Sequence, residues 1–280
     1  MSTKVAIQGF KASFHEIAAY TFFGREIETI ECDTFQALFD SIAPGGAADY
    51  AVMAIENSVA GAILPNYARL REAELEIFGE VYLRIEMNLM VLPGETIDSI
   101  TEVHSHPMAL LQTQQYFRQF PHIQLVESRD TALSAIEIVE QGIKGRGALG
   151  SKLIAETFGL DVIAEGIETN KRNFTRFLVL KRVGAASPMQ ESVPNKASLS
   201  FRALHRPGSL SAALSAMAMF GMNLSKIQSL PVLGEEWQYY MYVDLEFDDY
   251  ESYKEMLKVL QPLTNDLKIL GEYTQGQKYL

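Results

Sequence analysis

The sequence predicts an α/β domain with a mainly parallel sheet, followed by a ferredoxin-like βαββαβ plait. The first part shows short apolar runs that alternate with amphipathic helical patterns. The second part shows the order strand, helix, strand, strand, helix, strand over residues 197–270. A stretch rich in Ala, Ser and Pro without periodicity, residues 183–195, lies between them and is typical of a linker.

Apolar runs and capping residues give the elements of the first part in order. Strands are predicted over Lys4–Gln8, Tyr50–Ile55, Val81–Leu92, Glu102–His104, Ile123–Val126, Gly147–Gly150 and Phe177–Leu180. Helices are predicted after the N-cap residues Ser13, Ser105, Asp130 and Ser151. Parallel sheets bind ligands at the carboxyl ends of their strands. The loops that follow these strands are therefore candidate binding loops.

Period-2 and period-3.6 patterns define the second part. Its predicted strands are Ala197–Ala203, Asn223–Ser229, Tyr239–Phe247 and Leu267–Leu270, and its predicted helices are Leu210–Phe220 and Tyr250–Leu260. This order is that of the ferredoxin-like plait, in which two helices pack on one antiparallel sheet.

Composition excludes several classes of function. The chain has 280 residues, 48% hydrophobic and 21% charged, as expected for a globular protein. Its net charge of −11 disfavours nucleic acid and anionic membranes as partners. We see no stretch that suits a signal peptide or a membrane helix, so the predicted location is cytoplasmic. With Cys32 the only cysteine and no metal-ligand spacing of histidines, neither a metal nor another cofactor is expected.

One short segment runs against the acidic composition. Residues 171–182 contain five basic residues and no acidic one. Within this segment Arg176 is the residue expected to point into a site, because a guanidinium binds carboxylates in a bidentate way. The alternative interpretation, an edge strand protected by charge, stays open.

Five motifs of this sequence resemble those of the prephenate dehydratase family and occur in the same order along the chain. Residues 173–177 (NFTRF) resemble the family signature N-x-T-R-F. The other four are residues 55–61 (IENSVAG), 105–112 (SHPMALLQ), 130–135 (DTALSA) and 150–160 (GSKLIAETFGL). The plait resembles an ACT domain, through residues 206–210 (RPGSL) and 223–227 (NLSKI).

Two places depart from the family pattern. The opening loop has Ala12 where the family has its second glycine and His15 where it has serine. Alanine restricts φ, so this loop is expected to differ in shape, and His15 becomes a candidate ligand contact. The family's E-S-R-P in the plait reads QSLP at residues 228–231. This departure removes a possible ion pair near the regulatory pocket that the resemblance implies.

The resemblance implies both a fold and an activity. The implied fold is a two-lobed catalytic domain like the type II periplasmic binding proteins over residues 1–182, a linker at 183–196 and an ACT regulatory domain over 197–275. The implied activity is that of a carbon–oxygen lyase (a hydro-lyase), converting prephenate to phenylpyruvate with loss of carbon dioxide and water in L-phenylalanine biosynthesis. L-phenylalanine would be the feedback inhibitor, and the chain would form a homodimer or homotetramer.

The resemblance also implies roles for individual residues. Thr175 would donate a hydrogen bond to the leaving hydroxyl, Arg176 would bind a substrate carboxylate, and Asn57 would orient the substrate. Glu56 is left open between a general acid and a residue that supports the turn. Substrate binding is assigned to Ser105, Gln112, Asn173, Phe177 and Ser13. Binding of phenylalanine is assigned to Pro207, Gly208, Ser209, Leu210, Asn223 and Leu224. His106 is interpreted as a local hydrogen-bonding residue.

Two alternatives remain at the level of sequence. The first is arogenate dehydratase, whose substrate carries an amine in place of the ketone. The second is an amino-acid-sensing binding protein without catalysis, since two α/β lobes around a cleft also resemble solute-binding proteins.

Overall fold

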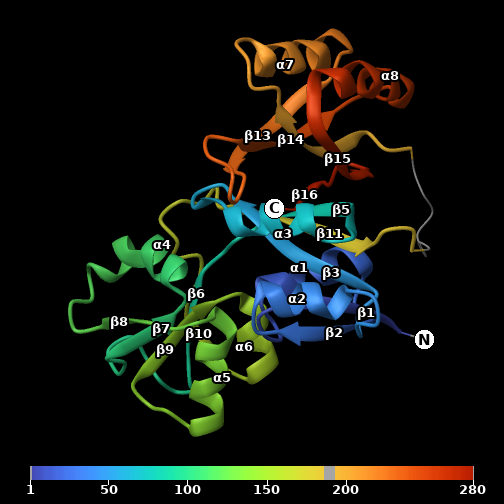
Figure 1. The fold of residues 1–280 in the computed structure, drawn as a ribbon. Helices are drawn as coiled ribbons and strands as arrows, with labels where there is room; N and C mark the ends of the chain where they lie inside the picture. The colour runs from blue at the N-terminus through green and yellow to red at the C-terminus, as the bar shows by residue number, and fades with distance from the viewer. Residues whose placement is uncertain (1, 186–192, 280) are drawn as a thin grey trace. The chain divides into compact units, whose positions relative to one another are not determined.

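The computed structural model describes residues 2–185 and 193–279, and its contacts divide the chain into two compact units (Figure 1). Unit 1 comprises Met1–Ala62, Val81–Phe177 and Lys278–Leu280. Unit 2 comprises Ile63–Glu80 and Leu178–Gln277. The predicted linker 183–196 falls largely on residues 186–192, which lie outside the described residues.

The first lobe of unit 1 is built on a sheet of the order β16-β5-β11-β3-β1-β2, with β4 paired to β3, and residues 75–80 of β5 and 178–182 of β11 are counted with unit 2. Its elements are β1 (Thr3–Gln8), α1 (Phe14–Phe23), β2 (Ile27–Cys32), α2 (Phe35–Ile42), β3 (Tyr50–Asn57), β4 (Gly61–Ala62), β5 (Leu75–Arg84), β11 (Phe174–Arg182) and β16 (Lys278–Tyr279). Strand β1 is parallel to both β2 and β3. Its residues Val5, Ala6 and Ile7 are fully buried, as in a strand covered on both faces.

The second lobe of unit 1 is built on a sheet of the order β10-β6-β9-β7-β8. Its elements are β6 (Asn88–Val91), β7 (Glu102–Ser105), α4 (Pro107–Phe117), β8 (Gln124–Glu127), α5 (Thr131–Gln141), β9 (Arg146–Gly150), α6 (Lys152–Phe158) and β10 (Asp161–Ala164). Strand β7 is parallel to β8 and β9, whereas β6 is antiparallel to β9 and β10. The sheet is therefore mixed, and the prediction of mainly parallel strands describes only half of it.

Two local predictions in unit 1 are corrected. The apolar run 81–92 is not one strand, because Ile85–Met87 break it and place β5 and β6 in different sheets. Ser105 is not a helix cap: it is the last residue of β7, and its Oγ donates to the Leu149 carbonyl at 3.0 Å. The cap of α4 is His106, whose Nδ1 accepts from the Met108 amide at 3.2 Å, so the local role predicted for His106 is confirmed.

Unit 2 contains the predicted βαββαβ arrangement on an antiparallel sheet of the order β13-β14-β12-β15. Its elements are α3 (Leu64–Glu72), β12 (Lys196–Ala203), α7 (Ser209–Met219), β13 (Asn223–Pro231), β14 (Tyr239–Glu246), α8 (Tyr250–Leu260), a short 3₁₀ helix (Gln261–Leu263) and β15 (Thr264–Tyr273). Among the helices of the part that the structure describes, none is both long and apolar enough to cross a membrane.

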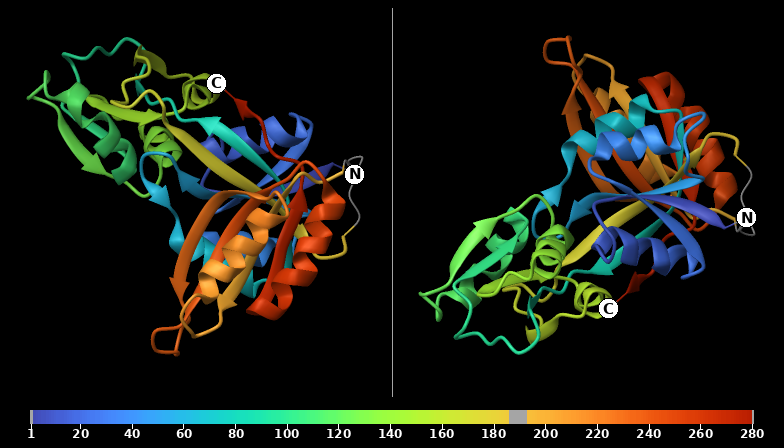
Figure 2. Two further views of the ribbon diagram at one scale, coloured as in Figure 1. Left: turned by 90° about the horizontal axis from the view of Figure 1, so that it is seen from above. Right: turned by 90° about the horizontal axis from the view of Figure 1, so that it is seen from below.

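The two faces of the unit 2 sheet are covered differently. Helices α7 and α8 lie side by side on one face, over an apolar core that includes Leu199, Phe201 and Tyr253 (Figure 2). The opposite face carries polar and aromatic side chains and is covered by residues 63–80, the segment of α3 and the first part of β5. The close approach requires glycine: a Cβ on Gly271 would lie 2.3 Å from the Ile77 carbonyl oxygen.

A buried ion pair fastens the same segment to the sheet. Lys196 Nζ lies 3.0 Å from Glu80 Oε1, and the two side chains are 1% and 0% exposed. The backbone amide of Gly276 donates to the same Glu80 oxygen at 3.1 Å. Because a buried charge is tolerated only when it is paired, Lys196 and Glu80 depend on each other.

Candidate active site

Asn57, the last residue of β3, is the centre of a hydrogen-bond network in unit 1. Its Nδ2 donates to Asn173 Oδ1 at 2.7 Å and to Thr175 Oγ1 at 3.0 Å. Asn173 Nδ2 in turn donates to Gln112 Oε1 at 2.9 Å. The network therefore unites four residues that sequence reasoning assigned to the site, from β3, α4 and the start of β11.

The backbone sets the orientation of every amide in this network. Asn57 Oδ1 accepts from the amides of Val59 and Ala60 at 2.9 and 2.8 Å, so its Nδ2 must face Asn173 and Thr175. Because Asn173 Oδ1 then accepts, its Nδ2 is the group that meets Gln112. No amide in the series can be turned around without breaking a bond to the next one.

Two donors are left over at the ends of the network. Thr175 Oγ accepts from Asn57, and its own O–H has no acceptor among the described residues. Gln112 Oε1 accepts from Asn173, and its Nε2 has no acceptor within residues 2–185 and 193–279. Thr175 is 8% exposed, so its hydroxyl is held in a largely dry place. The geometry provides oriented hydrogen-bond donors for an oxygen-rich molecule.

Arg176 and Glu56 lie on the other face of the same strands. Successive side chains of a strand point to opposite faces, so Arg176 points away from Thr175 and Glu56 away from Asn57. Arg176 Nη1 lies 3.2 Å from Glu56 Oε1, and the Arg176 side chain is only 3% exposed. The guanidinium also lies 5.9 Å from the ring of Tyr82. This pair links β3 to β11 directly behind the network.

Acidic residues outside the basic run 171–182 form ion pairs with it. Lys171 lies 3.6 Å from Glu168 and also contacts the Gly166 carbonyl, and Lys181 lies 3.1 Å from Glu76. With Arg176 on Glu56, three of the five basic side chains of this run are in ion pairs. The run is positive in sequence, but its charge is largely compensated in the fold.

His15, from the first turn of α1, contacts β3 and β11, the strands that carry Asn57 and Thr175. Its Nε2 accepts from the Ala54 amide at 3.2 Å, and its ring meets the Phe177 ring edge-on at 5.0 Å. Burial lowers the pKa of His15 to about 3, so the imidazole is neutral near pH 7. Phe177 is 1% exposed and packs against His15.

The opening loop carries the predicted N-cap Ser13 and a second side chain that binds a backbone amide. Ser13 Oγ accepts from the Glu16 amide at 3.4 Å, but the Glu16 carboxylate binds the amide of Ala12, at 2.6 Å, instead of that of Ser13. Ala12 has φ of +64°, so alanine adopts the left-handed conformation that glycine would favour. Its methyl group is fully buried, which offsets part of this strain.

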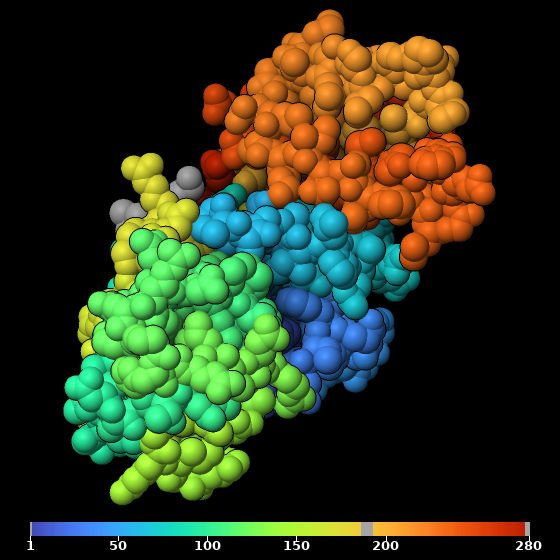
Figure 3. Space-filling view, turned by 90° about the vertical axis from the view of Figure 1, so that its left-hand side faces the viewer, coloured from blue at the N-terminus to red at the C-terminus, as the bar shows by residue number. Residues whose placement is uncertain are grey.

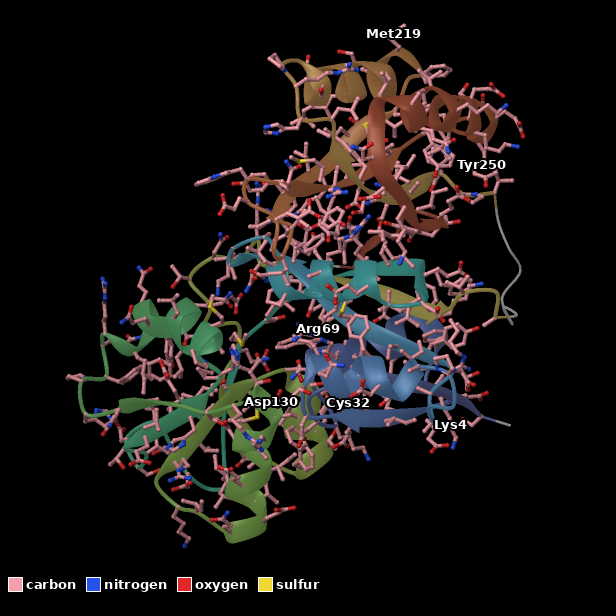
Figure 4. The ribbon with its side chains drawn as sticks, in the orientation of Figure 1. Lys4, Cys32, Arg69, Asp130, Met219 and Tyr250 are labelled. Atoms are coloured by element: carbon pink, nitrogen blue, oxygen red, sulfur yellow. The ribbon has the colours of Figure 1, made fainter. Side chains whose placement is uncertain are left out.

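Two contacts join the lobes of unit 1 near this loop. Ser151 Oγ donates to the Ala12 carbonyl at 2.8 Å. A Cβ on Gly9 would lie 2.8 Å from Asp130 Oδ2, so only glycine fits there. The space-filling view shows the first lobe in blue against the second in green, and Asp130 and Cys32 are labelled at this junction (Figures 3 and 4).

Asp130, predicted as a helix N-cap, also lies beside the opening loop, next to Gly9. It caps α5, where Oδ1 accepts from the Ala132 and Leu133 amides at 2.7 and 3.1 Å. Burial raises the pKa of its carboxyl, against the effect of these hydrogen bonds. Only the spacing D-T-A before an apolar helix signalled it, as a cap. By contrast, Ser105 is fully buried and bonded to Leu149, so its hydroxyl is already used.

A second candidate site is a pocket of about 490 Å³ in unit 2. Pro207, Gly208, Ser209 and Leu210, four of the residues assigned to phenylalanine binding, are among its lining residues. Asn223 and Leu224 are not among its lining residues, because Asn223 Nδ2 is bonded to Glu246 and Leu224 packs on the helix core. The lining residues that sequence reasoning missed are Ala203, Leu204, His205, Arg206, Ser211, Trp237, Gln238, Tyr239 and Met241.

Comparison with known proteins assigns the class. The family model described as prephenate dehydratase matches residues 5–185 of the chain. Because this match spans more than half of the chain, the protein belongs to the prephenate dehydratase family, whose members are hydro-lyases.

Individual relatives sharpen the assignment. The chain is 34% identical to the bifunctional chorismate mutase/prephenate dehydratase of Aquifex aeolicus, over 98% of this chain and 74% of the relative. It is 35% identical to arogenate dehydratase 5, chloroplastic, of Arabidopsis thaliana, over 96% of this chain and 67% of the relative.

Two solved structures resemble the whole chain. One is a prephenate dehydratase from Arthrobacter aurescens in complex with L-Phe, with a TM-score of 0.86 and 27% identity, over 99% of this chain and 92% of that one. The other is GqqA, described as a novel type of quorum-quenching acylase, with a TM-score of 0.86 and 29% identity, over 97% of this chain and 98% of that one.

Proposed function

We propose that this chain converts prephenate to phenylpyruvate, with the Asn57 network as the catalytic site. The observation that carries the proposal is the pair of unused donors, Thr175 Oγ–H and Gln112 Nε2, held by amides that cannot turn around. Membership in the prephenate dehydratase family supports the choice of substrate.

The reaction needs little chemistry from the protein. The ring C–O bond breaks and the hydroxyl leaves with its electron pair, taking up one proton to become water. The bond to the ring carboxylate breaks as carbon dioxide leaves, and its electron pair completes the aromatic ring. Thr175 donates a hydrogen bond to the departing oxygen and relays the proton, which is finally replaced from solvent. Gln112 holds a substrate oxygen, and Asn173 and Asn57 fix both donors.

We assign the Arg176–Glu56 pair to positioning. It holds β3 against β11 from the opposite face, and therefore fixes the distance between Asn57 and Thr175. The carboxylate-binding role predicted for Arg176, the binding roles predicted for Ser105, Phe177 and Ser13, and the general-acid role of Glu56 stay predictions.

For the whole chain we propose the division implied by the resemblance. Residues 1–182 form a two-lobed catalytic part of the type II periplasmic-binding-protein kind, and 197–275 form an ACT regulatory domain. L-phenylalanine binds in the unit 2 pocket, with its carboxylate at the start of α7, where Gly208 leaves the first amides without a side-chain cap. The L-Phe complex of the Arthrobacter relative supports this ligand. A homodimer or homotetramer and a cytoplasmic location remain predictions.

Arogenate is the alternative substrate, favoured by the likeness to the Arabidopsis relative. A competition assay with both substrates decides between them. If the chain turns over neither substrate but still binds L-phenylalanine, the result would instead indicate an amino-acid-sensing protein. Hydrolysis of an N-acyl amide, measured alongside, tests the activity named for GqqA.

Thr175 provides the direct test. Thr175→Val keeps the shape of the side chain and removes the hydroxyl, and should lower kcat by about 10²-fold or more with a smaller change in KM. Thr175→Ser retains the hydroxyl and is the matched control, expected to keep most of the activity. Phenylpyruvate absorbance gives the rates, and circular dichroism checks the fold. A kcat for Thr175→Val close to that of the wild type would remove Thr175 from the reaction.

A further inference from the structure

Arg71, on α3, is bound to three strands of the unit 2 sheet. Its Nη1 donates to the Ser200 carbonyl and hydroxyl at 3.3 and 2.8 Å, and its Nη2 donates to the Asp266 carbonyl at 2.8 Å. Its guanidinium carbon lies 3.8 Å from the centre of the Tyr240 ring, a cation–π contact. One side chain thus contacts β12, β14 and β15.

The pocket of unit 2 lies on the other face of two of these strands. Ala203, Tyr239 and Met241 line the pocket, whereas Ser200 and Tyr240 face Arg71. In the ladder of β12 and β14, Phe201 pairs with Met241, and Arg202 pairs with Tyr240. Since side chains alternate along a strand, Tyr240, which Arg71 contacts, lies in the chain between the pocket residues Tyr239 and Met241.

The helix that carries Arg71 leads directly to the catalytic network. The C-terminal end of α3 is fixed by Lys268, whose Nζ binds the carbonyls of Arg71 and Ala73. At its other end only Ile63 separates α3 from β4. Strand β4 pairs Ala62 with Glu56 and Gly61 with Asn57, the residue at the centre of the network.

We propose that Arg71 couples ligand binding in the unit 2 pocket to the geometry of the Asn57 network, through α3 and the β3–β4 hairpin. Occupancy of the pocket by an apolar amino acid changes the β12–β14 pair, Arg71 moves α3 with it, and β4 displaces Asn57 relative to Thr175. Arg71 is a positioning residue in this scheme and touches neither substrate nor effector. The proposal rests on the proposed function only for the identity of substrate and effector.

The test compares Arg71→Met with Arg69→Met in the full-length chain. Residues 69 and 71 are separated by about 200° around the helix, so Arg69, labelled in Figure 4, does not share the helix face of Arg71. L-phenylalanine binding is followed by the fluorescence of Trp237, which is the only tryptophan and lines the pocket. Two measurements report the coupling between the sites. One is the inhibition of prephenate turnover by L-phenylalanine, and the other is the effect of L-phenylalanine on amide hydrogen exchange of residues 56–62.

Arg71→Met should bind L-phenylalanine within about threefold of the wild type and keep its uninhibited rate. Its inhibition, and the exchange response of residues 56–62, should fall about fivefold or more, the lower end of usual coupling between sites. Arg69→Met should keep both. If Arg71→Met does not fold, Tyr240→Leu removes the ring under Arg71 and receives the same measurements.

An undiminished exchange response in the Arg71 variant would overturn the proposal, as would absence of L-phenylalanine binding or of any exchange response in the wild type. The two hypotheses fail separately. A wild-type chain that does not turn over prephenate contradicts the proposed function, while the exchange measurement still tests Arg71.

Discussion

Replacement of His15 tests whether a buried neutral imidazole makes the fold acid-sensitive. The pKa of His15 is lowered by burial to about 3 in the folded chain, against about 6.5 in the unfolded chain. Below pH 6.5 the unfolded chain therefore binds a proton that the folded chain does not bind. The free energy of unfolding therefore falls as the pH falls from about 6.5 towards 3, and His15 does not change it above about 6.5.

The magnitude follows from the two pKa values. Between pH 7.5 and pH 5.0 the unfolded chain gains about 2 kcal/mol from protonation of this one side chain, and the folded chain gains almost nothing. His15→Gln keeps an acceptor for the Ala54 amide but does not titrate. The wild type should therefore lose about 2 kcal/mol more than the variant over this range, whatever constant difference the substitution itself introduces.

The assay must report on unit 1, because Trp237 lies in unit 2 and its fluorescence follows the other unit. Hydrogen exchange of peptides covering α1 and β3, measured across a urea series at both pH values, gives the local free energy of unfolding. Equal losses in the wild type and in His15→Gln would refute the reasoning, since the imidazole would then titrate normally in the fold.

Two further substitutions test the ion pairs. Arg176→Lys keeps the charge beside Glu56 but loses the planar guanidinium. It should therefore lower the thermal midpoint and leave KM within about threefold of the wild-type value. A much larger rise in KM would show that Arg176 binds the substrate. Lys196→Met leaves Glu80 buried without its cation and should destabilise unit 2 by about 3–5 kcal/mol in urea unfolding followed by Trp237 fluorescence. The double variant with Glu80→Gln should recover part of that loss, and no recovery would show that the pair is not the cause.

Local pattern was sufficient for some elements and insufficient for others. The strands and helices of the plait were predicted nearly in full, because each follows one period and ends at turn residues. Helices α2 and α3 and strands β2 and β10 were not predicted. Strand β2, for example, alternates weakly and carries two glutamates. The run 81–92 was read as one strand because composition alone does not reveal that Ile85–Met87 pass from one sheet to another.

The site divides in the same way. Two motifs identified the pairs Thr175 with Arg176 and Glu56 with Asn57. Alternation along a strand already implies that Thr175 and Arg176 face opposite sides. Their partners lie 118 and 120 residues away in the sequence, so the pairing of each with Asn57 or Glu56 depends on the fold. The same holds for Arg71, which is ordinary in sequence and whose acceptors lie 129 and 195 residues further on.

The cover that residues 63–80 provide for the plait has a consequence for the growing chain. During synthesis this segment emerges long before β12, β14 and β15, which it needs to bury Leu75, Ile77 and Glu80. At about 5–20 residues per second, roughly 10–40 s pass between translation of residue 80 and residue 277. Over that interval Leu75 and Ile77 lack the strands that bury them. Unit 2 therefore completes its core only when its last strand has been made, although its first residues are made early.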